Sequence, residues 1–201
     1  MSTSQDVNDL IVALHEIGAF RFGDFVLKDG RHSPFYVDLR LLVSNPKVLA
    51  RAAHEMLACS QSLRFDRIAG IPYAGLPLAI AMCLESNRPL VYPRKEVKEY
   101  GTRKRVEGEF KPGERALVVD DVITTGGAKI EAVQPLRDAG LVVEDIIVLV
   151  DRQQDAEEML AEHGLRLHRV IRIEEALSGL ESAARISADE ARRAREFLQS
   201  R

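Results

Sequence analysis

The sequence has little cysteine and no tryptophan. Among its 201 residues there are two cysteines, and aromatic residues make up only 5% of the chain. Two cysteines are too few for a disulfide framework, and neither Cys59 nor Cys83 has a second Cys or a His at metal-ligand spacing. We expect both to be buried small apolar residues. The five histidines show no metal-ligand spacing either, and we expect no protein-bound structural metal.

The sequence also lacks long apolar runs and a strong excess of one charge. No stretch reaches the length of a membrane span, and the first ten residues, MSTSQDVNDL, have neither the basic nor the apolar region of a signal peptide. We therefore expect a cytoplasmic protein. The net charge is -3, with acidic and basic residues mixed along most of the chain, which does not favour nucleic-acid binding.

The hydrophobic pattern predicts an α/β fold in a single domain over residues 1–201. An opening helix over 6–18 and short β-rich segments up to about residue 40 precede a regular alternation of helices and strands, which is typical of a parallel sheet. Helices are expected over 46–60, 75–86, 127–139 and 154–163, and strands over 67–71, 89–92, 115–119, 145–150 and 165–173. A capping box formed by Ser187 and Glu190 predicts the start of a final helix.

The segment ALVVDDVITTGGA, residues 116–128, carries the strongest chemical signal. Its apolar run at 116–119 predicts a buried parallel strand with Asp120 and Asp121 at the carboxyl end, and the TTGG sequence at 124–127 opens a helix. Glycines, threonine hydroxyls and a helix N-terminus together suit a phosphate group. Two carboxylates would repel a phosphate, so we expect them to accept hydrogen bonds from sugar hydroxyls or to approach a substrate-bound metal ion. These features predict a pocket for ribose 5-phosphate.

A simpler explanation exists for a lone glycine-rich turn, because strand-to-helix turns with acidic caps are common in parallel α/β folds. The full string is more specific, and it has neither the lysine of a P-loop nor the GxGxxG of a dinucleotide fold.

A second unusual segment, residues 94–114, is polar and rich in Lys, Arg and Gly. A connection of this length inside a compact domain is usually functional or disordered, and we expect a mobile loop there.

The string VVDDVITTGG, residues 118–127, resembles the phosphoribosyl pyrophosphate signature of the type I phosphoribosyltransferases. This resemblance implies a parallel central sheet flanked by helices, with a small N-terminal hood. It places the core at about 46–155 and the hood at about 1–40 and in the C-terminal part. It also implies transfer of ribose 5-phosphate from phosphoribosyl pyrophosphate to a base, with Mg²⁺ bound together with this donor.

Four segments within about residues 20–155 resemble the orotate phosphoribosyltransferases, including the corresponding domain of UMP synthase, to which the loop is most similar. They are FVLKDGRHSPFYVDLR, AGIPYAGLPLA, RKEVKEYGTRKRVEG and VLVDRQ. The resemblance implies that orotate is the acceptor and that the products are orotidine 5′-monophosphate and pyrophosphate, in UMP biosynthesis. It also implies a homodimer with shared active sites, in which the loop of one subunit closes over the partner's site.

The same resemblance assigns site residues. Catalytic roles fall to Lys28, Lys98, Asp120 and Asp121. The residues expected to bind phosphoribosyl pyrophosphate are Lys28, Tyr73, Arg94, Lys95, Lys98, Tyr100, Asp120, Asp121, Val122, Ile123, Thr124, Thr125, Gly126, Gly127 and Ala128. The residues expected to bind orotate are Tyr36, Val37, Thr124 and Arg152, and the forked guanidinium of Arg152 would hold the orotate carboxylate.

Two positions depart from the family pattern. Tyr100 stands where many bacterial relatives have His, and Ala74 stands where many have Lys, so one donor contact is missing or supplied elsewhere. The chain ends too early to contain a decarboxylase, so only the transferase step is expected.

Two other functions share the donor motif. A purine phosphoribosyltransferase would have the same donor pocket, but the segments SPFYVDLR and VDRQ argue against it. A regulator that senses phosphoribosyl pyrophosphate and binds nucleic acid would need a broad basic face, and the sequence offers only the basic cluster at 94–105.

Overall fold

The structure is a computed structural model, and it describes residues 3–27, 30–95, 105–152 and 156–200. The helices are α1 (Ser4–Glu16), η1 (Leu39–Ser44), α2 (Pro46–Cys59), α3 (Gly75–Ser86), α4 (Gly127–Asp138), α5 (Ala156–Glu162), α6 (Ile173–Ser182) and α7 (Ala188–Gln199). The strands are β1 (Phe20–Val26), β2 (His32–Val37), β3 (Arg67–Gly70), β4 (Leu90–Pro93), β5 (Val106–Glu107), β6 (Arg115–Ile123), β7 (Val142–Asp151) and β8 (Arg166–Arg172).

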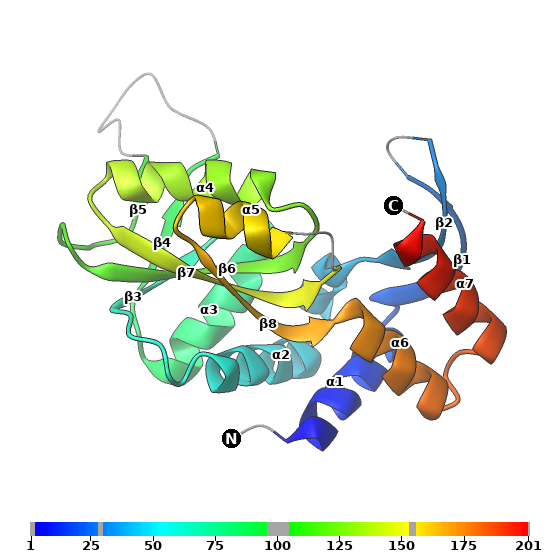
Figure 1. Ribbon diagram of the computed structural model, residues 1–201. Helices are drawn as coiled ribbons and strands as arrows, with labels where there is room; N and C mark the ends of the chain where they lie inside the picture. Colours follow the sequence, from blue (N-terminus) through cyan, green and yellow to red (C-terminus); the bar gives the residue numbers. More distant parts are fainter. Residues whose placement is uncertain (1–2, 28–29, 96–104, 153–155, 201) are drawn as a thin grey trace.

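The core is a six-stranded sheet in the order β5-β4-β3-β6-β7-β8 (Figure 1). The pairs from β4 to β8 are all parallel, as the alternating pattern predicts. Strand β5, within the 94–114 segment, pairs with β4 in the antiparallel direction at the edge of the sheet. Strand β8 carries the sheet beyond the core limit expected at about residue 155.

Helices cover both faces of the sheet because the buried strands are apolar on both sides. Along β6, Leu117 and Val119 join the core formed with α2 and α3, whereas Ala116 and Val118 join the core formed with α4 and α5. This alternation is the period of two that a strand imposes on its side chains. Figure 1 shows α4 and α5 on one face and α2 and α3 on the other.

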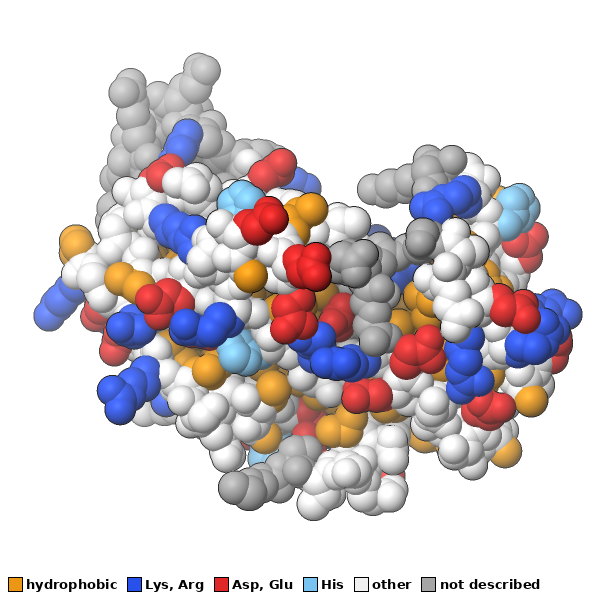
Figure 2. Space-filling view, viewed as in Figure 1, with side chains coloured by type: hydrophobic (Ala, Val, Ile, Leu, Met, Phe, Trp, Pro, Cys, Tyr) orange, Lys and Arg blue, Asp and Glu red, His pale blue; other side chains and the backbone are white. Residues whose placement is uncertain are grey.

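The hood consists of the β1–β2 hairpin together with α1, α6 and α7, and it lies beside the carboxyl ends of the parallel strands (Figure 1). Gly18 follows α1 with a φ of +79°, a conformation that glycine adopts without steric cost, and the chain then enters β1. On the face shown in Figure 2 the surface is hollowed between the hood and the core.

The structure corrects two expectations. Strand β6 continues to Ile123, so Asp120 and Asp121 lie inside the strand and not beyond its end. The β-branched residues that follow them extend the pairing, since Val122 pairs with Val150 on β7. Cys59 is exposed, with its thiol donating to the Arg169 carbonyl oxygen at 3.5 Å, and Cys83 is only half-buried where it packs against the core.

Candidate active site

The strand-turn-helix unit from β6 to α4 forms the base of the site. Gly126 is the N-cap of α4 and has a φ of +88°, which favours glycine. A Cβ placed on Gly127 would meet no heavy atom within 4 Å, so a ligand can come close to this backbone. Because glycine offers no side chain to cap the helix, an anion is a suitable partner for its first N–H groups.

The two acids of β6 have different environments. Asp120 is 4% exposed, and its carboxylate accepts a hydrogen bond from the Asp121 backbone N–H at 2.8 Å. It also forms an ion pair with the ammonium of Lys129. Burial, and then the negative charge of Asp120, raise the pKa of Asp121 to about 7. One carboxylate is therefore neutralised by a fixed cation, while the other changes its protonation near neutral pH.

The segment between β3 and α3 lies directly against this pair. The Pro72–Tyr73 peptide is cis, and Gly75 begins α3. A Cβ on Gly75 would lie 2.6 Å from the Val119 carbonyl oxygen and 2.9 Å from the Asp120 Cα. Glycine at position 75 thus allows the start of α3 to pack onto the strand that carries Asp120.

The basic residues that follow β4 share a cavity with Asp120. This cavity has a volume of about 430 Å³ and is lined by Ile71, Pro72, Pro93, Arg94, Lys95, Asp120, Ala128, Lys129, Glu131, Ala132 and Pro135. Arg94 forms an ion pair with Glu107 on β5 at 3.0 Å, and the Lys95 ammonium lies 5.0 Å from the centre of the Tyr73 ring. Three sequence segments expected to bind the donor therefore meet around one space.

The residues expected to bind the base come from the ends of β6 and β7 and from β2 of the hood. The Arg152 backbone N–H donates to the Ile123 carbonyl at 3.0 Å, which places Arg152 beside the turn that begins with Thr124. The Arg152 guanidinium lies 5.2 Å from the centre of the Phe35 ring on β2. Tyr36 and Val37 follow Phe35 on this strand, so Arg152 is brought to the part of the hood that carries them.

The Tyr36 ring is held by neighbours from the hairpin. Its centre lies 5.7 Å from that of Phe25, and the Arg21 guanidinium lies 5.4 Å from it. Arg40 donates to the Tyr36 hydroxyl at 3.5 Å. A flat ring with fixed neighbours is suited to support a planar ligand.

The structure describes only some of the other residues that are expected to bind the donor. Lys28, Lys98 and Tyr100 lie outside the described residues. Thr125 in the turn and Ala128 in the first turn of α4 are exposed, whereas the Ile123 side chain is buried in the core, so Ile123 can contribute only through its backbone.

One site residue, Lys129, was missed from the sequence. A signal was present, because a lysine in the first turn of a helix opposes the helix dipole and is uncommon there without a compensating charge. Its partner Asp120 is nine positions earlier in the chain and comes close only through the strand-turn-helix geometry.

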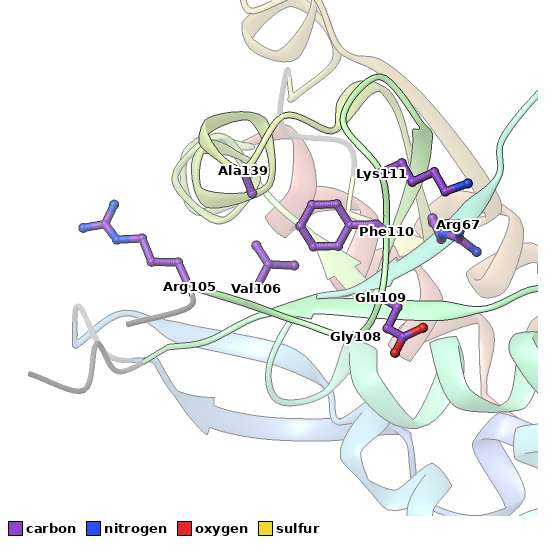
Figure 3. Close-up of a pocket in the computed structure, with 8 residues that line it drawn as sticks. All are labelled: Arg67, Arg105, Val106, Gly108, Glu109, Phe110, Lys111 and Ala139. Atoms are coloured by element: carbon purple, nitrogen blue, oxygen red, sulfur yellow. The ribbon is translucent and has the colours of Figure 1, made fainter. Parts of the chain in front are cut away.

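A different cavity, of about 520 Å³, lies near the β5 edge of the sheet. Figure 3 shows Phe110, Val106 and Ala139 facing one another there, while the charged ends of Arg105 and Lys111 point in opposite directions. Because its cations do not converge, we do not assign an anion site to this cavity.

On the face shown in Figure 2, basic and acidic side chains are interspersed and do not form one basic patch.

Comparison with known proteins identifies the class of protein to which the chain belongs. The phosphoribosyl transferase domain family matches residues 42–166, which include β3 to β7 and the whole β6–α4 unit. The chain is 42% identical over 180 residues to the orotate phosphoribosyltransferase of Cenarchaeum symbiosum, covering 88% of this chain and 90% of the relative. The crystal structure of the orotate phosphoribosyltransferase from Aeropyrum pernix superposes with a TM-score of 0.76 at 36% identity, covering 89% of this chain and 99% of that one.

The chain belongs to the orotate phosphoribosyltransferase family and has the type I phosphoribosyltransferase fold. It is also 37% identical over 195 residues to the uridine 5′-monophosphate synthase of Bos taurus, covering 96% of this chain. The chain spans only 41% of the length of that relative.

Proposed function

We propose that the chain transfers ribose 5-phosphate from phosphoribosyl pyrophosphate to orotate, giving orotidine 5′-monophosphate and pyrophosphate in pyrimidine biosynthesis. The observation that carries this proposal is the continuity of one site. The Asp120–Asp121 pair and the proposed phosphate-binding turn share β6–α4, the basic residues that follow β4 open into the same cavity as Asp120, and Arg152 follows the neighbouring strand. Membership of the orotate phosphoribosyltransferase family supports the choice of acceptor.

The turn at 124–127 would hold the 5′-phosphate of the donor. Backbone N–H groups at Gly126 and Gly127 and the N-terminus of α4 favour an anion there. Asp120 and Asp121 would accept hydrogen bonds from the ribose hydroxyls, which fixes the sugar relative to the acceptor base. The bond between the sugar anomeric carbon and the pyrophosphate oxygen then breaks as the orotate ring nitrogen bonds to that carbon.

Positive charge at the end of β4 would stabilise the leaving group. Arg94 and Lys95 line the cavity, and Tyr73 lies beside Lys95. Pyrophosphate departure concentrates negative charge, and fixed cations in a site closed to water lower the energy of that charge. Lys28 and Lys98 complete the set that we assign to the reaction centre.

Orotate differs from uracil by a carboxylate, and Arg152 is the residue that we assign to it. Its guanidinium can bind a carboxylate through two parallel hydrogen bonds. Tyr36 and Val37 would flank the ring, with Thr124 at its edge. Little general base assistance is needed because orotate is already an anion, so positioning and charge stabilisation would supply most of the rate.

We propose that Mg²⁺ arrives with the donor. The described residues contain no group of three or more His, Cys, Asp or Glu suited to hold a metal ion. Asp120 is already paired with Lys129, so Asp121 is the carboxylate that could approach an ion carried by phosphate oxygens and water. When bound, Mg²⁺ would neutralise part of the pyrophosphate charge.

A homodimer with shared active sites is part of the proposal. Large apolar side chains are exposed along α3 and the segment before it, namely Tyr73 at 65%, Ile80 at 46% and Leu84 at 79%. Ile80 and Leu84 are one helical turn apart and so lie on the same face of α3. An exposed apolar stripe of this kind favours a subunit interface.

We further propose a cytoplasmic location. No helix within the described part of the chain is long and apolar enough to cross a membrane. Cys59 and Cys83 are free thiols, as is usual in a reducing compartment.

The proposed reaction is tested by mixing the purified protein with orotate, phosphoribosyl pyrophosphate and Mg²⁺. We expect orotate absorbance to fall while pyrophosphate and orotidine 5′-monophosphate accumulate in equal amounts. Release of pyrophosphate without a nucleotide product would show hydrolysis of the donor and would contradict the transfer reaction.

A further inference from the structure

Lys129 occupies an unfavourable position for a lysine. It is the third residue of α4, within the first turn, where the helix dipole favours negative side chains. Its side chain is only 13% exposed. Burying an ammonium group costs free energy unless the group is paired, so a lysine at this position needs an oppositely charged or hydrogen-bonding partner.

The ion pair with Asp120 provides part of that compensation. The Asp120 side chain is 6% exposed, and its other oxygen accepts the Asp121 N–H at 2.8 Å. Pairing at the base of the site therefore fixes the orientation of the carboxylate that we assign to the ribose hydroxyls. An ammonium has three N–H donors, and one bond to Asp120 leaves others for a ligand.

Three cations, Arg94, Lys95 and Lys129, and two acids, Asp120 and Glu131, line the cavity beside Lys129, so its lining carries a net positive charge that favours an anion. Arg94 and Lys95 line this space of about 430 Å³ together with Ala128 and Lys129 of the first turn of α4. Ala74, at the start of α3, brings no charge to the segment that borders this space. Within the described part of the chain, Lys129 thus contacts Asp120 and also lines the space that Arg94 and Lys95 line.

We propose that Lys129 is a donor-binding residue that bridges Asp120 and the pyrophosphate group of phosphoribosyl pyrophosphate. This inference rests on the proposed function and adds a contact to it. The ammonium keeps its bond to Asp120 and donates to an oxygen of the leaving group, so the ribose and the pyrophosphate are held by one linked pair. In a site closed to water, this fixed charge also stabilises pyrophosphate as it departs.

The test is calorimetric titration of the protein with inorganic pyrophosphate and, separately, with ribose 5-phosphate, both in Mg²⁺ buffer. Lys129→Met should weaken pyrophosphate binding at least about tenfold, the loss expected for a hydrogen bond to a charged group, and should affect ribose 5-phosphate much less. Lys47→Met, on the exposed surface of α2, is the matched control and should bind both probes as the unaltered protein does. Equal pyrophosphate affinity in Lys129→Met and the unaltered protein would overturn the proposal.

A double variant separates direct contact from charge balance. Lys129→Met leaves the Asp120 carboxylate unpaired, whereas Lys129→Met combined with Asp120→Asn restores neutrality at the pair. If Lys129 contacts pyrophosphate, binding stays weak in the double variant. If binding returns to the original affinity, Lys129 acts only by neutralising Asp120, and the proposal is wrong. Circular dichroism checks that each variant is folded.

The titrations need no turnover, so they can fail separately from the proposed function. Pyrophosphate binding that depends on Lys129, in a protein that does not consume orotate, would leave this inference standing and overturn the acceptor. If instead the protein consumes orotate and Lys129→Met leaves the Michaelis constant for phosphoribosyl pyrophosphate unchanged, the proposed function stands and the role of Lys129 is wrong.

Discussion

The guanidinium of Arg152 lies 5.2 Å from the centre of the Phe35 ring, and this contact joins the end of β7 to the hood. Phe35 is itself packed edge-to-face against Phe197 of α7, with ring centres 6.0 Å apart. A residue assigned to the orotate carboxylate thus lies against the Phe35 ring, which is itself packed on a ring from a distant part of the chain. The hood therefore does more than cover the core, because it orients the cation that we expect to select the base.

Replacement of Arg152 by Lys tests this role. Lysine keeps the positive charge but cannot form the two parallel hydrogen bonds of a guanidinium with a carboxylate. We expect the Michaelis constant for orotate to rise at least about tenfold, with a much smaller change for phosphoribosyl pyrophosphate. Steady-state kinetics with each substrate varied in turn gives both values. Arg193→Lys, at a residue on α7 with a 63% exposed side chain, is the control. Similar effects on both substrates would argue against carboxylate recognition by Arg152.

The raised pKa of Asp121 predicts a dependence of stability on pH. The folded protein holds this carboxyl at a pKa of about 7, against an ordinary value near 3.8. Its contribution to stability is therefore complete below pH 3.8 and is lost as the pH rises through about 7. Asp121→Asn cannot ionise, so between pH 5 and pH 8 it should gain stability relative to the unaltered protein by the order of 2 kcal/mol.

Thermal unfolding of the ligand-free proteins across this pH range makes the comparison, and other titrating groups cancel between the two. A stability difference that stays constant with pH would show that Asp121 is not perturbed in this way.

Two glycines provide a matched pair of substitutions. Gly75→Ala would place a Cβ 2.6 Å from the Val119 carbonyl oxygen, and we expect it to destabilise the fold by ~2 kcal/mol. Gly127→Ala meets no heavy atom within 4 Å, so the fold should keep its stability. The added methyl group at Gly127 would instead obstruct the phosphate, so affinity for ribose 5-phosphate should fall.

Thermal unfolding and calorimetric titration with ribose 5-phosphate distinguish the two glycines. A stable Gly127→Ala protein that binds ribose 5-phosphate normally would remove the turn at 124–127 from the donor site.

Shared active sites can be tested by complementation. Lys98→Ala and Arg152→Ala are each expected to be nearly inactive. If Lys98 acts in the partner's site, a heterodimer of the two variants has one intact site out of two and should show about half of the original activity. Isolation of the heterodimer with two affinity tags allows a direct assay. No recovery would place Lys98 in its own subunit's site or exclude the dimer.

The sequence pattern locates many elements well because periodicity and caps are local signals. The helix expected over 75–86 matches α3, and the Ser187–Glu190 capping box begins α7. Helix α6 was overlooked although Ile173, Ala176, Leu177 and Leu180 follow the 3.6-residue period, because the preceding strand pattern ran into its first residue. The continuation of β6 past its two acids could not be read from local pattern, since it depends on pairing with β7.

The site residues also separate into those that local sequence predicts and those that only a family resemblance or the fold identifies. The acid pair and the turn that we propose to bind phosphate follow from residue chemistry, because their parts are adjacent in sequence. The roles of Lys28, Tyr36 and Lys98 came only from resemblance, since a single lysine or tyrosine near a turn has no distinctive pattern. The Lys129–Asp120 and Arg152–Phe35 contacts required the fold, because each joins separate elements.

The most direct test of the central claim is a comparison of acceptors with purified protein, phosphoribosyl pyrophosphate and Mg²⁺. Orotate, uracil, adenine and hypoxanthine are supplied separately, and loss of each base is followed by its absorbance. We predict that orotate alone is consumed, and that uracil, which lacks the carboxylate that Arg152 would bind, is not. Consumption of adenine or hypoxanthine in preference to orotate would contradict the assigned acceptor while leaving the donor site in place.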